Sequence, residues 1–348
     1  MSFHKKALYT DMTQNYLTPV EPMPHTRVKV RFRTGRGNVD RVTICYNGQK
    51  AIMRKDSFDD MFDYYAYHIR LTDEPIYYHF EVEAEDESCY YNRLGISKSE
   101  EARYDFILVP GFATPDWAKG AVVYQIYVDR FYNGDSSNDV VNDEYFYQGR
   151  PVKHAGHWND PVSRTDEGTF YGGDLQGIID KMDYLEGLGV EVLYLNPIFV
   201  SPSSHKYDIQ DYRHIDPHFG KIVNREECGL KDGYEQYRGI TTDRENLEAS
   251  DRLFARMVEE AHKRGMKVIL DGVFYCCGSW HRFMDKEGIY ANGDTCSIKG
   301  AYQDSNSPYR EYFQYKNPQD ANSYENWWGY EAYAKFNYEN SRKLYEYI

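Results

Sequence analysis

The stretch VEVLYLNPIF, residues 190–199, constrains the fold more than any other part of the chain. Its apolar residues first alternate and then follow one another without interruption, a pattern typical of a buried strand in a parallel sheet. Pro197 and Pro202 end this strand, so the residues that come next lie on the loop at its carboxyl end. In a (β/α) barrel, that is the edge of the sheet where catalytic and binding residues are found.

The tract HKYDIQDYRHIDPHFG, residues 205–220, lies on this loop. It combines flat rings with carboxylates, a mixture that suits a polyhydroxylated ligand. The rings include His205, Tyr207 and Tyr212, and the carboxylates are Asp208, Asp211 and Asp216. An aromatic residue on a loop packs against its own protein more often than it binds a ligand. The residue types alone therefore leave both interpretations open for each ring.

Residues 26–110 have a pattern of period two. The run TRVKVRFRT places Val28, Val30 and Phe32 on one face and its basic side chains on the other. Similar runs follow, separated by turn signals such as Asn47-Gly48. Several short strands without a helical pattern between them predict an antiparallel β-sandwich.

The middle of the chain alternates strands with helices. A β-branched and aromatic run at 121–131 predicts a first strand, and apolar residues at helical spacing over 175–188 predict a helix that ends at Gly189. After the strand at 190–199, a second helix precedes Gly265, and MKVILDGVF supplies a third strand. This order predicts the beginning of a (β/α) barrel with right-handed crossovers. A polar insertion at 221–246 has no assigned role.

Length and charge limit the functional classes. A chain of 348 residues is long enough for two or more domains. A net charge of −14 argues against nucleic acid and anionic membrane surfaces as partners, and it is compatible with a neutral glucan. The first residues lack the apolar segment of a secretory signal, and no run of about 18 apolar residues occurs, so we expect a cytoplasmic protein. Six scattered cysteines lack metal-ligand spacing and are expected to be free thiols.

The motifs YQIYVDRF, YGGDLQG, NPIF and HKYDIQDYRHIDPHFG occur in this order along the chain. Together they resemble the α-amylase superfamily, glycoside hydrolase family 13, and most closely its neopullulanase, cyclomaltodextrinase and maltogenic amylase branch. The resemblance implies an N-terminal antiparallel β-sandwich, similar to a carbohydrate-binding module, followed by an incomplete (β/α)8 TIM barrel with a domain B excursion after the third strand. The expected boundaries are 1–110 for the sandwich, 111–278 for three β/α units, 279–330 for the excursion, and 331–348 for the start of the next barrel helix.

The same resemblance assigns substrate-binding roles on an α-glucan oligosaccharide. Tyr207 matches the tyrosine that stacks beneath the sugar being cleaved, His205 matches a nearby subsite residue, and Asp271 matches a carboxylate that shapes the site. The family reads Asp-x-x-x-Asn-His from this Asp, whereas this chain has Cys276 at the His position. A thiol is a weak donor, so the contact is lost or must come from elsewhere, with His281 as one candidate.

A loop rich in side-chain oxygens follows the first predicted strand. It contains Asn133, Asp135, Asn138 and Asp139, which suit Ca²⁺ because this ion takes six to eight oxygen ligands. An Asx-rich turn explains the same residues. The family resemblance implies a structural Ca²⁺ site completed by the carbonyl of Gly172 and by Asp174. An alternative role for Asp174 is to cap the next helix.

Retaining glycosidases use two carboxyl groups about 5–5.5 Å apart. The family places its nucleophile Asp, its acid/base Glu and a supporting Asp after the fourth, fifth and seventh barrel strands. This sequence supplies three strands and no G-x-R-x-D motif. We therefore expect it to be the N-terminal portion of an α-glucan hydrolase, without catalytic residues and inactive by itself.

Two alternatives remain open at this point. Tyr275 and Cys276 also suit an amylase-like protein without catalysis, such as a scaffold or sugar sensor. The third possibility is a glucan-binding module that carries some barrel residues. The sandwich contains no Trp, which favours a structural or interface role, and the resemblance implies that it contributes to a homodimer.

Overall fold

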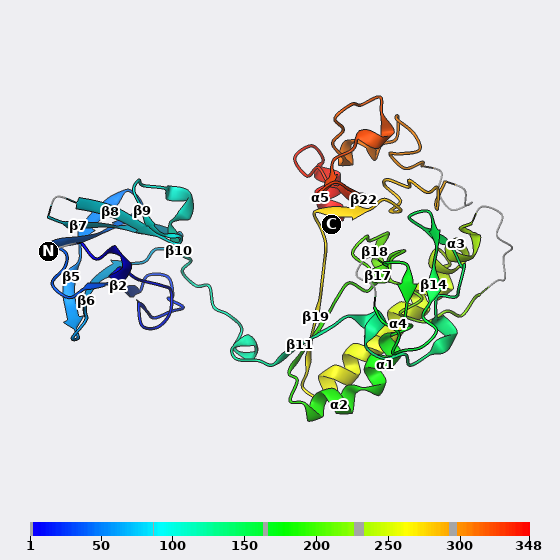
Figure 1. The fold of residues 1–348 in the computed structure, drawn as a ribbon, viewed down its shortest axis with the longest axis horizontal. Coiled ribbons are helices and arrows are strands. Elements are labelled where there is room, and N and C mark those ends of the chain that lie inside the picture. Colours follow the sequence, from blue (N-terminus) through cyan, green and yellow to red (C-terminus); the bar gives the residue numbers. More distant parts are fainter. Residues whose placement is uncertain (1–2, 86, 163–165, 226–232, 292–297) are drawn as a thin grey trace. The chain divides into compact units, whose positions relative to one another are not determined.

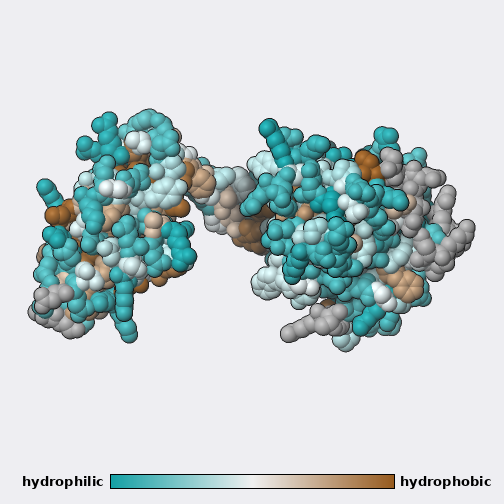
Figure 2. All heavy atoms as spheres, turned by 90° about the horizontal axis from the view of Figure 1, so that it is seen from above, coloured by the Kyte–Doolittle hydropathy of each residue, from teal (hydrophilic) through white to brown (hydrophobic). Residues whose placement is uncertain are grey.

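The computed structural model describes residues 3–85, 87–162, 166–225, 233–291 and 298–348 (Figure 1). The chain divides into two compact units, Met1–Gly120 and Ala121–Ile348. Each unit has its own hydrophobic core. Figure 2 shows that hydrophilic residues cover most of the visible face of each unit, in keeping with a sequence in which 28% of the residues are charged.

The first unit is built from two antiparallel sheets. One sheet has the order β1-β2-β6-β5, with strands β1 (Leu17–Thr18), β2 (Arg27–Gly35), β6 (Phe62–Arg70) and β5 (Arg54–Phe58). The other has the order β4-β3-β7-β8-β9, with β10 also paired to β7; its strands are β4 (Gln49–Ile52), β3 (Arg41–Tyr46), β7 (Ile76–Ala84), β8 (Glu87–Asn92), β9 (Gly95–Ser97) and β10 (Phe106–Leu108). This arrangement agrees with the sandwich expected from the alternating sequence.

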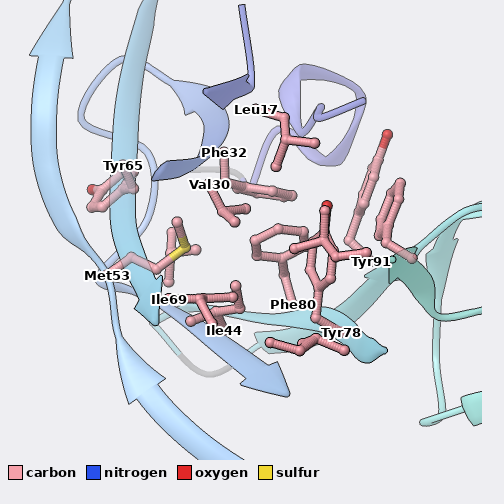
Figure 3. Close-up of a cluster of buried hydrophobic side chains, with 14 of the residues drawn as sticks. Leu17, Val30, Phe32, Ile44, Met53, Tyr65, Ile69, Tyr78, Phe80 and Tyr91 are labelled. Atoms are coloured by element: carbon pink, nitrogen blue, oxygen red, sulfur yellow. The ribbon is translucent and has the colours of Figure 1, made fainter. Parts of the chain in front are cut away.

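Alternating burial holds the two sheets together. Along β2, Val28, Val30 and Phe32 are fully buried while the residues between them are partly exposed. Phe32 meets Phe80 of the other sheet with ring centroids 4.6 Å apart, and both rings lie inside the buried cluster in Figure 3. The apolar face of each sheet is therefore covered by the other, as the period of two requires.

The second unit contains a parallel sheet of three strands, β11 (Val123–Ile126), β16 (Val192–Leu195) and β19 (Lys267–Leu270), in the order β11-β16-β19. The connections carry the helices α1 (Leu175–Asp180), α2 (Met182–Gly187), α3 (Glu235–Thr241) and α4 (Arg244–Lys263). The helix expected over 175–188 is in fact two helices separated at Lys181. Figure 1 shows α1, α2 and α4 beside the strands, where their apolar faces cover the sheet.

Most other pairings in this unit are antiparallel. They involve β12 (Phe146–Tyr147) with β13 (Arg150–Pro151), β17 (Phe199–Val200) with β18 (Asp211–Ile215), and the sheet β20-β22-β21 made of β20 (Cys276–Gly278), β22 (Tyr330–Lys335) and β21 (Asn326–Trp327). The short strands β14 (Lys153–His154) and β15 (Thr169–Phe170) pair in parallel. Short 3-10 helices occur at Lys5–Ala7, Ala102–Tyr104, Asp116–Ala118, Val128–Arg130, Ser136–Asn138, Arg310–Tyr312 and Ala321–Ser323.

The C-terminal segment corrects one expectation. We expected residues 331–348 to begin a barrel helix, but β22 occupies Tyr330–Lys335, and the helix α5 begins only at Arg342 and ends at Tyr347. The strand β22 pairs with both β20 and β21, which satisfies its backbone on two sides. Within the described parts of the chain, none of the helices combines the length and apolar character that crossing a bilayer requires.

Candidate functional site at the carboxyl end of the parallel strands

The tract at 205–220 begins in the connection between β17 and β18, and the buried side chain of Lys206 holds this connection in place. Lys206 is fully buried, and its Nζ donates to Asp216 Oδ2 at 2.6 Å and to the Ser201 carbonyl at 2.6 Å. Its backbone has φ of +61°, a conformation that favours glycine and that the surrounding contacts must hold. The side chain of Lys206 therefore anchors the turn on which Tyr207 is carried.

Asp216 extends this anchor into a charged network. His218 Nδ1 lies 3.0 Å from Asp216 Oδ1, and His218 Nε2 lies 2.8 Å from Glu144 Oε1. Burial alone would raise the pKa of Asp216, but attraction to Lys206 and the hydrogen bonds from His218 and Lys206 hold that pKa well below its usual range. Burial likewise opposes the charged form of His218, yet Glu144 and Asp216 raise its pKa.

Tyr207 and Asp271 meet at the end of the sheet. β19 ends at Leu270, and the backbone N–H of Asp271 donates to the Leu195 carbonyl of β16 at 2.9 Å. The Tyr207 hydroxyl donates to Asp271 Oδ2 at 2.7 Å. Burial and this hydrogen bond to a carboxylate both raise the pKa of Tyr207. The two residues are 64 positions apart in sequence and form one polar pair at the carboxyl edge of parallel strands.

The Tyr207–Asp271 pair lines a cavity of about 490 Å³. His205 lies in its wall, where its Nδ1 accepts from the Tyr207 backbone N–H at 3.0 Å. On the opposite side of the ring, His205 Nε2 lies 3.5 Å from Glu167 Oε2 and 3.4 Å from the Tyr333 hydroxyl. The hydrogen bond from His205 lowers the pKa of Glu167, so a carboxylate faces this cavity. Aromatic rings and polar atoms thus both line this cavity.

Several wall residues were not found by sequence reasoning. Glu167, Trp327 and Tyr333 line the same cavity but come from segments far from the tract in sequence. The aromatic density of NWWGYEAY was visible in the sequence, whereas Glu167 carried no signal because it follows no predicted strand. The sheet β20-β22-β21 carries Trp327 and Tyr333, whereas the Glu167 carbonyl accepts from the Ser204 N–H at 3.0 Å beside the tract.

Cys276 lies elsewhere. The resemblance places Cys276 at the position of a substrate-binding histidine, but its side chain is fully buried beside Ile209 and Val273 and does not line the cavity. Burial raises the pKa of the Cys276 thiol to about 12. His281 is fully buried as well, and burial lowers its pKa to about 3. Neither side chain lines the cavity.

Two of the carboxylates in the tract are also internal. Asp208 is buried, accepts from the Tyr147 hydroxyl at 2.9 Å and is bonded to the Ser203 hydroxyl. Burial raises the pKa of Asp208. With Asp216 bound to Lys206, these two carboxylates support the loop and do not face the cavity.

The residues expected to hold Ca²⁺ form one cluster. Asp174 caps α1 by accepting from the Gly177 N–H at 2.6 Å, and its second oxygen accepts from the Asp135 N–H at 2.8 Å. Asn138 is fully buried; its Nδ2 donates to the Gly220 carbonyl at 2.9 Å, while its Oδ1 has no hydrogen-bond partner. An unpaired buried oxygen costs free energy unless something satisfies it.

Asp139 and Gly172 lie on the other side of this cluster. Asn133 Nδ2 donates to Asp139 Oδ1 at 2.8 Å, and a Cβ added to Gly172 would lie 2.4 Å from each of these two atoms. Burial, together with repulsion from Asp174, raises the pKa of Asp139 to about 6. Asp135 Oδ2 is bound instead to Lys221 Nζ at 2.5 Å. Among the described residues, no group of three or more His, Cys, Asp or Glu side chains is arranged to hold a metal, so amide and carbonyl oxygens would have to contribute.

Comparison with known proteins identifies the family. The catalytic domain of alpha amylase matches residues 125–228 and 236–347, and the N-terminal Ig-like domain of alpha amylase matches residues 1–109. An amylopullulanase of Thermoanaerobacter thermohydrosulfuricus is 38% identical over 238 residues, 63% of this chain and 14% of that protein. Neopullulanase 2 of Thermoactinomyces vulgaris is 33% identical over 288 residues, 78% of this chain and 42% of that protein.

A solved structure agrees with these matches. The type III pullulan hydrolase from Thermococcus kodakarensis superposes with a TM-score of 0.55 at 25% identity, over 98% of this chain and 52% of that chain. The chain therefore belongs to the α-amylase family, with the N-terminal and catalytic domains of that family in sequence. Its relatives include neopullulanases, cyclomaltodextrinases and maltogenic amylases, which confirms the predicted resemblance. The chain spans 52% of this solved structure, 42% of the neopullulanase and 14% of the amylopullulanase. It therefore corresponds to only a part of each of these proteins.

Proposed function

We propose that this chain is the N-terminal part of a retaining α-glucan hydrolase that acts on starch, maltodextrin, cyclodextrin or pullulan. In this proposal β11, β16 and β19 are the first three strands of a (β/α)8 barrel, and the sheet β20-β22-β21 belongs to domain B. The observation that carries the proposal is the Tyr207–Asp271 hydrogen bond at the carboxyl edge of parallel strands, inside a cavity walled by rings.

The chemistry of the cavity suits a pyranose. The ring of Tyr207 offers a flat apolar surface for the carbon–hydrogen face of a sugar, and Asp271 fixes the orientation of that ring through its hydroxyl. His205 and Glu167 present polar atoms to sugar hydroxyls from the side. Hydrolysis requires two further carboxyl groups on opposite sides of the glycosidic bond, which we assign to later barrel strands. We therefore predict that these residues bind the sugar but do not cleave it.

Calorimetric titration of the 348-residue chain with maltotriose tests this proposal. We expect binding to the unaltered chain and a loss of about tenfold or more in Tyr207→Ala, because the stacking surface and the bond to Asp271 both disappear. Tyr184→Ala is the matched control, since Tyr184 is exposed on α2 and lines no part of the cavity. Absence of heat with the unaltered chain would refute the proposal, and release of reducing sugar from starch would refute the assignment of catalysis to other strands.

A second candidate is an amylase-like sugar-binding protein without catalysis. The burial of Cys276 favours it, because the family has a histidine at this position and no replacement reaches the cavity from His281. The two candidates agree on maltotriose binding and differ in turnover. Starch hydrolysis by a longer form of this protein, abolished by replacing its nucleophile, would exclude the second candidate.

We also propose a structural Ca²⁺ ion held by oxygens of Asn133, Asn138, Asp139, Asp174 and the Gly172 carbonyl. The unpaired Oδ1 of Asn138 and the raised pKa of Asp139 both support it, because a cation would satisfy the first and favour the charged form of the second. Asp135 fits less well, since its carboxylate is bound to Lys221. The ion would tie the loop after β11 to the start of α1.

A further inference from the structure

An exposed tryptophan occupies a position that disfavours it. β21 and β22 form a hairpin in which Trp327 pairs with Tyr330, so Trp328 and Gly329 are its two loop residues. Their φ angles are +52° and +89°, as a two-residue turn of type I′ requires. Asn-Gly is the usual choice for this turn, and a bulky aromatic residue with positive φ is an outlier. Trp328 is nevertheless 84% exposed, so burial does not compensate for the strained backbone.

Trp328 extends a surface made by its neighbours. Its ring stacks on that of Trp327, with centroids 5.2 Å apart and an interplanar angle of 16°. Tyr330 adds a third ring, 6.2 Å from Trp327. We call Trp327, Trp328 and Tyr330 the aromatic platform. A rule of local structure that is broken without a gain in packing is a sign of function.

The aromatic platform is continuous with the cavity at Tyr207. Trp327 and Tyr333 line both that cavity and a second hollow of about 900 Å³, which also contains Trp328 and Tyr330. Glu167 is shared in the same way. The platform therefore lies along a path that leads away from the Tyr207–Asp271 pair and is not an isolated patch.

Polar groups border the rings of the second hollow. Lys286 Nζ and Glu331 Oε2 form an ion pair of 2.7 Å there, and Gln148 contributes an amide from the hairpin of β12 and β13. Flat rings with hydrogen-bonding groups at their edges match a neutral chain of pyranoses, which has apolar faces and a rim of hydroxyls. The net charge of −14 disfavours a polyanion on the same surface.

We propose that the aromatic platform is a binding subsite for glucose units of an α-glucan beyond the unit held at Tyr207. This inference rests on the proposed function, because it assigns the platform to the same substrate. Its consequence is a dependence on chain length. Short sugars occupy the cavity alone, whereas longer oligosaccharides also stack on Trp328 and bind more tightly.

The test is calorimetric titration of the 348-residue chain with maltose and with maltoheptaose. Trp328→Asn removes the ring and supplies a residue that the turn prefers, so the variant folds and its Tm is not lowered. We expect its affinity for maltoheptaose to fall by about three- to tenfold and its affinity for maltose to stay unchanged. Trp328→Tyr retains a ring and is expected to recover the affinity to within about twofold.

Trp117→Asn is the control, because Trp117 has an exposed ring in the first unit and lines neither hollow. Equal affinity of Trp328→Asn and the unaltered chain for maltoheptaose would refute the assignment of the aromatic platform as a subsite and leave the proposed function intact. A uniform loss with both sugars would also overturn it, since the effect would then concern the cavity. If the unaltered chain bound neither sugar, the proposed function and this inference would fail together.

Discussion

Replacing Lys206 with Met tests how the loop that carries Tyr207 is held. The Lys206 ammonium makes its two bonds, to Asp216 and Ser201, in a fully buried position. Methionine keeps most of the volume and removes both bonds, so the buried Asp216 carboxylate loses its ammonium partner and keeps only His218. Breaking a buried ion pair on one side costs about 3–5 kcal/mol. In a domain of about 150–250 residues, this corresponds to a fall in Tm of about 6–20 °C.

The loss of stability should depend on pH. The pKa of Asp216 is depressed in the folded protein, so this group contributes stability that is present above its unfolded value of 3.8 and is lost as the pH falls through the folded value. Removal of Lys206 takes away the strongest attraction that opposes burial, so the pKa of Asp216 rises although His218 remains as its partner. The difference between the variant and the unaltered chain is therefore largest near pH 7 and shrinks as the pH approaches 4.

Scanning calorimetry at pH 7 and at pH 4.5 measures this difference for the second unit. Lys335→Met is the matched control, because Lys335 pairs with Glu325 at 3.2 Å on the exposed side of β22 and a pair of that kind contributes about 0–1 kcal/mol. The reasoning is refuted if Lys206→Met unfolds within about 1 kcal/mol of the control at pH 7, or if its deficit grows on acidification.

Three further predictions concern the cavity and the loops around it. Tyr207→Phe keeps the ring but leaves Asp271 without its 2.7 Å partner, and we expect maltotriose affinity to fall less than in Tyr207→Ala; equal losses in titration calorimetry would exclude a stacking role. A chelator should lower Tm, and Ca²⁺ at one hundred times its Kd should restore Tm by adding about 2.7 kcal/mol to the free energy of unfolding. This rescue should weaken as the pH falls below 6, because Asp139 is then protonated; a Tm unaffected by the chelator would count against the ion. His281→Phe should lower the free energy of unfolding by about 1–3 kcal/mol in urea titrations, because Nδ1 of this buried ring accepts from the Phe283 backbone N–H at 3.1 Å and phenylalanine leaves that N–H unpaired; an unchanged or higher stability would refute this reasoning.

The type of each sheet could be predicted from the local pattern of apolar residues along its strands. Alternation along β2 and the uninterrupted apolar run of β16 gave the correct type of sheet, because each pattern reports how many faces of a strand are buried. Placing Asp271 at the end of β19 followed from the same reasoning. The helix expected at 331–348 was wrong in its first part, because tertiary pairing of β22 with two neighbouring strands outweighed local helix preference.

The site was only partly predictable, since its wall is assembled from distant segments. Tyr333 lines the cavity from β22, which pairs with β20, and Glu167 lines it from the segment before β15; neither carries a periodic signal of its own. The direction of Cys276 was equally hidden, because it depends on which face of β20 turns inward. A motif identifies the loop, but the partners of each side chain are determined by the tertiary fold.

In the tract at 205–220, aromatic side chains line the cavity and buried carboxylates support the loop. Asp208 and Asp216 were interpreted as groups for a polyhydroxylated ligand, yet both are buried and bound to the protein itself. Their bonds to Tyr147 and Lys206 fix the backbone from which His205 and Tyr207 project into the cavity. A stacking surface binds well only if its ring is already oriented before the sugar arrives, because ordering it on binding would cost affinity. The buried carboxylates of this tract thus hold the two rings in a fixed orientation. A change at Lys206 should therefore weaken sugar binding, although Lys206 does not line the cavity.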